Sequence, residues 1–299
     1  MITIFACLRH FKGQFAVIQR NAIISWTLLS PKPEIILLGD EEGTAEICHE
    51  LGLIHVPGVA RSKFGGQLIN DLFEKAQRLA KYDLICYVNS DVIVTQSLIQ
   101  AIDIVRKQWK RFVLFCGVWN LAIEHEIDFY GLDWEGQLRN LVHKNEKTPA
   151  VSQSADLFLF PKWFYRNIPP FAMGGTAWDN WLIFKARAEK IPLIDASKFM
   201  FIVHADHDGT THSDRWIKNK DYDINLSLTS WWLRTFMRLD APYSLEEDGR
   251  LRKKRIFELL QPRINAIKSC YLLNNKIWMA AYYFKRRLMP RLKNLFNIK

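Results

Sequence analysis

The stretch DLICYVNSDVIV at residues 83–94 indicates the fold of this chain. Its run LICYV predicts a strand that is buried on both faces, and the polar run Asn89-Ser90-Asp91 ends that strand. Strands without apolar–polar alternation are typical of parallel sheets that helices cover on both sides. Ligands bind beyond the carboxyl ends of such strands, so we expect a site at Asn89-Ser90-Asp91.

Alternating patterns extend from this stretch in both directions. Short β-branched or apolar runs predict strands, and apolar positions at helical spacing predict helices between them. The expected strands are residues 2–8, 34–39, 53–59, 83–88, 111–119, 155–161, 192–197 and 199–205, and the expected helices are residues 15–29, 41–52, 65–82 and 177–190. This order predicts an α/β fold with a mostly parallel sheet flanked by helices.

Composition excludes several classes of protein. Hydrophobic residues make up 49% and charged residues 24% of the 299 residues, which are globular values and exclude collagen-like and wholly disordered chains. No apolar run reaches the roughly 18 residues that a membrane-spanning helix needs. We interpret the opening apolar run as a buried strand and not as a signal peptide. The five cysteines form no CxxC motif, which fits a reducing compartment.

Charge divides the chain into two parts. Residues 250–299 contain 14 Lys or Arg residues and one acid, so the first 249 residues carry a net charge of about −3 although the whole chain carries +10. We therefore expect an α/β catalytic domain at residues 1–240 and a basic, aromatic, helical C-terminal extension at residues 241–299.

The composition of the extension favours binding to an anionic membrane surface. Basic clusters flank Trp278, Tyr282, Tyr283 and Phe284, and aromatic and cationic side chains together are typical of helices in a membrane interface. The alternative is a helical appendage that packs on protein. Binding to nucleic acid is not expected, because no nucleic-acid-binding signature is present.

Asp91 is the first candidate functional residue. A carboxylate beyond a strand end can hold a divalent cation that also binds the phosphates of a substrate. The alternative interpretation is that Asp91 makes a turn or caps the next helix.

Asp179 is the second candidate. It lies in GGTAWDNW, where two glycines precede a helix, and it falls in the first turn of that helix beside Trp178 and Trp181. A carboxylate at a helix start is most often a cap. The functional interpretation is a general base aimed at a cleft whose aromatic walls suit a sugar ring.

Two further segments offer ligands. VHADHDGTTH contains His204 and His207, which are candidate metal ligands together with Asp91. The alternative there is a solvated polar loop. RSKFGGQ places Arg61 and Lys63 before a helix whose free N–H groups could receive a diphosphate, although a plain turn has the same pattern.

In this order these segments resemble inverting nucleotide-sugar glycosyltransferases of the GT-A fold, in particular a family-2-like bacterial branch. The resemblance covers about residues 2–212. EIILLGDEEG resembles the strand and acidic turn that meet the nucleotide base, at Asp40, and CYVNSD stands where the family has its DxD motif. AWDNW and VHADHD resemble the family's acidic helix start and its C-terminal His-containing motif.

The resemblance implies a mechanism and partners. Asp91 with His207 and His204 would hold Mn²⁺ or Mg²⁺ on a nucleoside diphosphate sugar, and Asp179 would be the base of an inverting single displacement. The acceptor would be a glycan or lipid-linked acceptor in cell-surface polysaccharide or glycolipid synthesis. The enzyme would lie in the cytoplasm, peripherally on the inner face of the membrane.

One departure keeps alternatives open. The first DxD position is Asn89, so a metal-independent transferase is one alternative. A non-catalytic glycan- or membrane-binding protein with a degenerate transferase fold is another. A nucleotidyltransferase of similar architecture is a third, although the glycine-rich, Lys-containing N-terminal loop that such enzymes use is missing.

Overall fold

The structure is a computed structural model that describes residues 1–131, 133–145, 155–206, 220–230 and 233–259. The chain forms two compact units, Met1–Lys253 and Lys254–Lys299. The account below concerns the first unit, because only residues 254–259 of the second are described.

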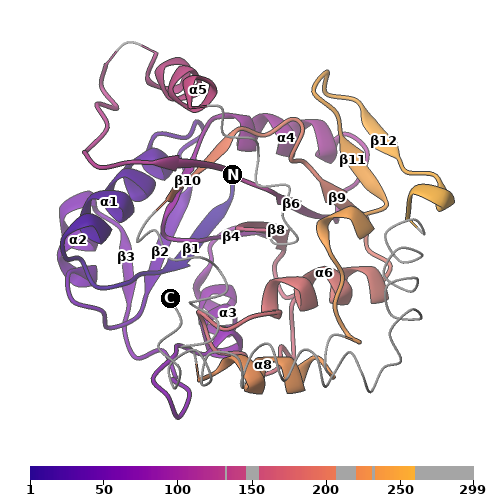
Figure 1. Ribbon diagram of the computed structural model, residues 1–299, viewed down its shortest axis with the longest axis horizontal. Coiled ribbons are helices and arrows are strands. Elements are labelled where there is room, and N and C mark those ends of the chain that lie inside the picture. Colours follow the sequence, from indigo (N-terminus) through magenta and orange to yellow (C-terminus); the bar gives the residue numbers. More distant parts are fainter. Residues whose placement is uncertain (132, 146–154, 207–219, 231–232, 260–299) are drawn as a thin grey trace, which may run out of the picture. The chain divides into compact units, whose positions relative to one another are not determined.

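A nine-stranded sheet forms the centre of the first unit (Figure 1). Its strands, in spatial order, are β12 (Leu251–Lys253), β11 (Tyr243–Leu245), β9 (Leu193–Asp195), β6 (Val113–Cys116), β8 (Leu157–Pro161), β4 (Leu84–Val88), β1 (Thr3–Cys7), β2 (Glu34–Leu38) and β3 (Ile54–Val56). All of them run parallel except β8 and β12. The carboxyl ends of the parallel strands therefore share one edge with the start of β8.

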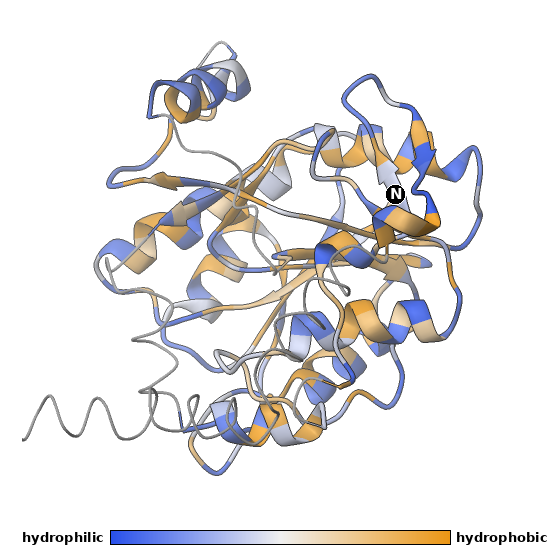
Figure 2. Ribbon diagram, turned by 45° about the vertical axis from the view of Figure 1, so that its right-hand side comes forward, coloured by the Kyte–Doolittle hydropathy of each residue, from blue (hydrophilic) through white to orange (hydrophobic). Residues whose placement is uncertain are grey.

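Helices cover both faces of this sheet, and apolar side chains fill the space between. One face packs on α1 (Gln14–Thr27), α2 (Thr44–Leu51) and α4 (Ser97–Arg106). The other packs on α3 (Ile69–Leu79), α6 (Trp178–Ala188) and α8 (Tyr222–Leu228). Figure 2 shows apolar colour along the central strands, which is the pattern expected of strands that are buried on both faces.

A second sheet of three strands begins just beyond the carboxyl end of β4. Its strands are β5 (Val92–Val94), β10 (Ile202–Asp206) and β7 (Trp119–Ala122), with β10 in the middle. The helix α5 (Trp134–Lys144) packs on it through Leu138 and Val142. The first of these strands, β5, begins at Val92, directly after Asn89-Ser90-Asp91, and the sheet therefore helps to position Asp91.

The predicted α/β class, with its mostly parallel sheet between helices, is confirmed. The helical structure expected for the extension at residues 241–299 is wrong for residues 243–245 and 251–253, which form the strands β11 and β12. Leu245 is fully buried in the core of the first unit, so this unit extends past residue 240 to Lys253. Most of the expected basic extension, residues 260–299, lies outside the described residues.

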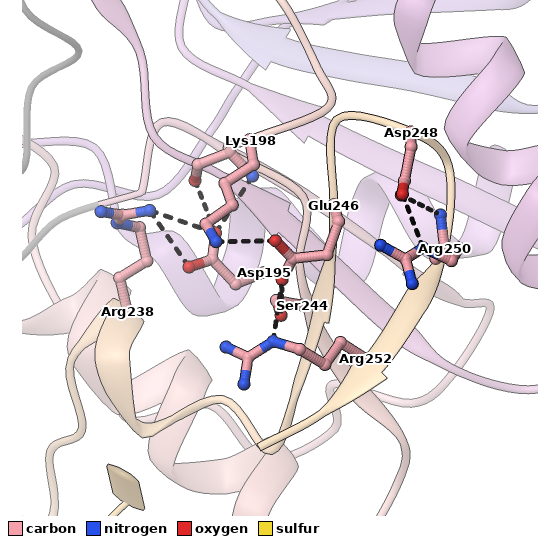
Figure 3. Close-up of polar contacts among 9 residues, drawn as sticks. Asp195, Lys198, Arg238, Ser244, Glu246, Asp248, Arg250 and Arg252 are labelled. Carbon is pink, nitrogen blue, oxygen red and sulfur yellow. Dashed lines mark hydrogen bonds and ion pairs between the residues drawn. The ribbon is translucent and has the colours of Figure 1, made fainter.

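Charged side chains fasten β11 and β12 to the rest of the first unit (Figure 3). Arg238 donates to Asp195 at the end of β9, with an N–O distance of 3.1 Å. Glu246 accepts from Lys198 at 2.7 Å and from Arg252 at 3.1 Å, and these bonds, together with one from Ser244, lower the pKa of Glu246 to about 2. The Lys198–Glu246 contact links the turn after β11 to the segment after β9, beside the strand pairing of β11 with β9.

None of the helices in the described part of the chain is both long and apolar enough to cross a membrane.

Candidate functional site

The candidate site lies at the carboxyl edge of the central sheet. Asn89 follows the last residue of β4, and Asp156 precedes the first residue of β8. Because β8 is antiparallel to β4, with Val88 opposite Leu157, the two polar residues meet at the same edge.

Asn89 forms a bridge within this edge. Its side-chain amide donates to Asp156 Oδ1 at 2.7 Å, and its backbone N–H donates to the carbonyl of Asp156 at 3.0 Å. The hydroxyl of Tyr87 donates to Asn89 Oδ1 at 2.7 Å. Both ends of the amide are therefore engaged, and Asn89 fixes the turn that precedes Asp91.

Asp91 lies beside His204, as the sequence suggested. The backbone N–H of Ala205 in β10 donates to the carbonyl of Asp91 at 2.9 Å, which brings β10 alongside the turn. The Nε2 of His204 is 3.4 Å from Asp91 Oδ2, and 18% and 15% of the two side chains are exposed.

The charge environment of His204 is strongly acidic. Burial disfavours its charged form, but the carboxylates of Asp91, Asp156 and Asp206 outweigh burial and raise its pKa to about 9. This shift favours an imidazolium beside the Asp91 carboxylate, and a cation bound at His204 would require the neutral ring and displace that proton.

Asp179 occupies the start of α6 and is mostly buried. Burial raises its pKa to about 7, and the negative charge of Asp156 adds to the rise. The backbone N–H groups of Asn180 and Ala155 donate to the carboxylate and limit the shift. A carboxylate with a pKa near the working pH is suited to act as a general base.

Asp156 connects these groups, and the sequence analysis missed it. It bonds to Asn89 directly, and its charge raises the pKa of both Asp179 and His204. Its position at the beginning of an apolar run gives no functional signal. Only the antiparallel direction of β8 places it at the carboxyl edge.

The tryptophans beside Asp179 do not form the walls of a sugar site, contrary to expectation. Trp178 and Trp181 are each only 7% exposed and pack in the core on the face of the sheet that α3 and α6 cover. The ring of Trp178 contacts the ring of Tyr87 edge-on, with centroids 5.4 Å apart. Trp178 thus fastens the start of α6 to the end of β4.

The predicted diphosphate loop has a different arrangement. Arg61 donates to Glu41 at 2.6 Å and to the carbonyl of Gly65 at 2.9 Å, while the ammonium of Lys63 lies over the ring of Phe64. The helix begins only at Ile69, whose N–H donates to the carbonyl of Phe171. The backbone N–H of Ile69 is therefore not free to bind a diphosphate, as the sequence suggested it would be.

Glu41, and not Asp40, faces inward at the end of β2. Both oxygens of Asp40 accept from the N–H of Gly58, so Asp40 closes an exposed turn. Glu41 is only 16% exposed, and its Oε2 is buried with no hydrogen-bond partner among the described residues. Glu41 offers an acceptor to a ligand at this edge, together with the guanidinium of Arg61.

Asn225 of α8 holds the loop that leads into α6. Its amide donates to the carbonyls of Ala172 and Thr176 at 3.0 and 3.2 Å, and its oxygen accepts from the N–H of Ala172 at 2.9 Å. A Cβ on Gly175 would lie 2.2 Å from this amide, so only glycine fits there. Asp179 follows this loop and depends on it for its position.

The donor set for a metal is partly present. Mg²⁺ in substrate complexes typically has one or two carboxylate ligands, with water and phosphate oxygens completing the shell. Asp91 supplies one such carboxylate, and the neighbouring His204 would add a ring nitrogen once its proton is lost. Among the described residues, no group of three or more His, Cys, Asp or Glu side chains could hold a metal ion by itself. His207, the other predicted ligand, lies outside the described residues.

No protein-family model and no curated protein matches the chain by sequence. Solved structures match it by shape. TarS from S. aureus in complex with UDP-GlcNAc has 11% sequence identity and a TM-score of 0.51, with 78% of this chain and 67% of that chain covered. Another TarS structure has 11% identity and a TM-score of 0.47, with 68% and 60% covered. The mannosyltransferase PcManGT from Pyrobaculum calidifontis, in complex with GDP-Man and Mn²⁺, has 13% identity and a TM-score of 0.46, with 72% and 60% covered.

These matches concern the fold. The chain spans 60% of the length of the first TarS structure and 67% of the complex with UDP-GlcNAc. The fold is of the GT-A type that nucleotide-sugar glycosyltransferases have, and this prediction is confirmed.

Proposed function

We propose that this chain is a nucleotide-sugar glycosyltransferase. The observation that supports this most is the meeting of Asp91, His204, Asp156 and Asp179 at the carboxyl edge of a GT-A sheet. A carboxylate with a raised pKa can act as a general base, and a second carboxylate at the same edge can hold a cation on a diphosphate, so the arrangement suits sugar transfer from a nucleoside diphosphate sugar.

The donor would lie across the strand ends with its diphosphate at Asp91. Asp91 and His204, with His207 as a further ligand, would hold Mn²⁺ or Mg²⁺, whose charge stabilises the departing diphosphate when it is bound. Glu41 and Arg61 are placed to contact the nucleoside, since Glu41 Oε2 is an unpartnered acceptor in the described structure. Lys63 remains a candidate contact for the phosphates.

Asp179 would be the general base. Its carboxylate takes the proton of an acceptor hydroxyl as that oxygen attacks the anomeric carbon, and the bond to the diphosphate breaks on the opposite face. The sugar is thereby transferred with inversion of the anomeric configuration. The acceptor would be a glycan or lipid-linked chain of a cell-surface polysaccharide or glycolipid.

The basic extension would hold the protein on the inner, anionic face of a membrane. Sedimentation with vesicles that contain phosphatidylglycerol tests this, by comparing the full chain with a chain that ends at Lys253. Equal binding by both would overturn the membrane proposal.

The transfer reaction is tested by the release of nucleoside diphosphate from a panel of UDP-, GDP-, dTDP- and CDP-sugars. We expect one donor to be turned over, with a rate that rises through about pH 7 as Asp179 loses its proton. Asp179→Asn should lower kcat about 10²-fold or more. Near wild-type turnover by Asp179→Asn would refute the role of Asp179, and retention of configuration would refute the single displacement.

The hydrogen bonds of Asn89 favour one alternative, a non-catalytic protein. The amide of Asn89 is neutral and already bonded to Tyr87 and Asp156, so it is a weaker cation ligand than the first aspartate of a DxD motif. A non-catalytic protein with a degenerate transferase fold would have this feature, and it would release no diphosphate from any donor of the panel.

A further inference from the structure

A cleft of about 1130 Å³ opens at the edge of the sheet opposite the candidate site. Its walls come from loops at the amino ends of parallel strands. Asp83 precedes β4, Arg111 lies just before β6 and Pro192 precedes β9, while Lys162 follows the end of the antiparallel β8. The cleft is therefore separated from Asp91 and Asp179 by the length of the strands.

The cleft is strongly basic although the first 249 residues carry a net negative charge. Its lining includes five basic side chains and two acidic ones: Lys110, Arg111, Lys162, Arg166 and Lys185, with Asp83 and Glu189. A hollow lined by charges of one sign concentrates its electric field and attracts ligands of the opposite sign.

Three of the basic side chains have no carboxylate partner in the part of the chain that the structure describes. Lys185 pairs with Glu189 at 2.7 Å, and the ammonium of Lys162 donates to the carbonyl of Ala80 at 2.6 Å. No acidic side chain within the described residues pairs with Lys110, Arg111 or Arg166. Their charges remain available to a ligand.

Trp163 adds an aromatic wall. Its side chain is 38% exposed, and the guanidinium of Arg166 lies 5.6 Å from the centroid of its ring. Its backbone has a φ of 65°, which is rare for a bulky residue and marks a turn held by its surroundings. An exposed indole beside a guanidinium suits a ligand that has both a ring face and a negative charge.

We propose that this cleft binds an anionic glycan, a chain of sugar rings that carries phosphate or carboxylate groups. Lys110 and Arg111 would contact the charges, and Trp163 would pack against a ring. The volume exceeds the roughly 300–1,000 Å³ of pockets for a single drug-sized ligand, so several sugar units fit. The cationic groups line a hollow that a flat bilayer surface would not enter, which favours a chain-like ligand over a membrane.

The choice of a glycan rests on the proposed function, because a transferase that extends a polymer gains from a second contact with its acceptor. Linking two contacts on one chain raises the effective concentration at the active edge. The position of the cleft at the far edge of the sheet would admit only acceptors long enough to reach around it.

Calorimetric titration of the full chain with dextran phosphate at low ionic strength tests the proposal. Lys110→Gln/Arg111→Gln should weaken binding about ten-fold. The matched control is Lys32→Gln/Lys144→Gln, which removes two exposed charges elsewhere and should leave binding unchanged. Because all variants keep the basic extension, differences between them report on the cleft. Equal affinities of the two double variants would overturn the proposal.

Two further probes separate a glycan from other anions. Trp163→Ala should weaken binding of dextran phosphate about five-fold and leave binding of inorganic polyphosphate, which has no rings, unchanged. If Lys110→Gln/Arg111→Gln weakens binding to phosphatidylcholine–phosphatidylglycerol vesicles equally and Trp163→Ala affects neither ligand, the cleft faces a membrane and the glycan proposal is wrong. Failure of the proposed transfer would appear separately, as an absence of diphosphate release, and leaves these binding ratios intact.

Discussion

The buried position of Asp179 suits a general base but lowers the stability of the folded protein at neutral pH. Burial and the neighbouring Asp156 make its charged form unfavourable and raise its pKa to about 7. In the unfolded chain the same carboxyl ionises near pH 3.8. The folded protein therefore loses stability as pH rises from about 4 to 7, because the folded state binds a proton that the unfolded state has released.

Asp179→Asn should remove this loss. At pH 8 the variant is expected to be more stable than the wild type, and its advantage should shrink by about 2 kcal/mol between pH 8 and pH 5.5. Urea denaturation at the two pH values measures the difference. A constant difference between the two proteins across this range would show that the carboxylate is not held in a costly environment.

Asn89→Asp recreates two carboxylates in the DxD-like turn, and the structure predicts that it harms the protein. The new carboxylate would lie where Asn89 now donates to Asp156 at 2.7 Å. Two carboxylates at that distance repel each other unless they share a proton, so we expect a loss of about 2 to 3 kcal/mol at pH 8 and less at pH 5.

The double variant Asn89→Asp/Asp156→Asn is the control for this prediction. It exchanges the amide and the carboxylate across the same hydrogen bond, and the hydroxyl of Tyr87 still finds an acceptor. We expect it to recover most of the lost stability in thermal denaturation. A double variant as unstable as Asn89→Asp would contradict the bridging role of Asn89.

At the residue scale the sequence predicted only part of the site. Asp91 follows a recognisable strand, Asp179 lies at the start of a recognisable helix and His204 lies in a histidine-rich segment, so the sequence offers all three as candidates, and their roles stay predictions. Asp156 and Asn225 were missed because their roles depend on contacts with distant segments, across the antiparallel β8 and from α8. Trp178 and Trp181 were misassigned because sequence does not show which side of a helix faces the core.

At the scale of elements, α8 positions the loop before α6. Asn225 is fully buried and makes three hydrogen bonds to the backbone of residues 172–176. Because the start of α6 carries Asp179, the geometry of the general base depends on a helix that contributes no catalytic group.

Asn225→Ala should therefore reduce both stability and activity. Leaving the backbone groups of the loop unpaired should cost about 2 to 4 kcal/mol, and kcat should fall more than KM changes. Ser227→Ala on the same helix is the control, because that hydroxyl is exposed and bonds only within α8, and it should change stability by less than about 0.5 kcal/mol. Wild-type kcat in a folded Asn225→Ala would contradict the positioning role.

The sequence predicted the central elements well, because strands such as β4 are buried on both faces and helices such as α3 have a single apolar stripe. It failed at β11 and β12, which have three residues each and no clear alternation. Backbone pairing of β11 with β9 and the burial of Leu245 hold these strands, and such long-range pairing leaves no local pattern.

At the scale of the whole molecule, the position of β11 and β12 decides where the chain can be cut. A chain that ends at Lys253 contains the complete first unit, and it should unfold cooperatively. A chain that ends at Asp240 loses two strands and the buried Leu245, and it should melt at a markedly lower temperature. Equal melting temperatures for the two chains would show that these strands do not belong to the folded unit.

The central claim is that the carboxyl edge of the sheet binds a nucleoside diphosphate at Asp91. Thermal denaturation of the full chain with UDP, GDP, dTDP, CDP and ADP, each with Mn²⁺ and with a chelator, tests it most directly. One nucleotide at about 100 times its Kd should stabilise the wild type by about 2.7 kcal/mol, and Asp91→Asn, measured against its own baseline, should lose this stabilisation. No stabilisation by any nucleotide, or equal stabilisation of Asp91→Asn, would contradict the account.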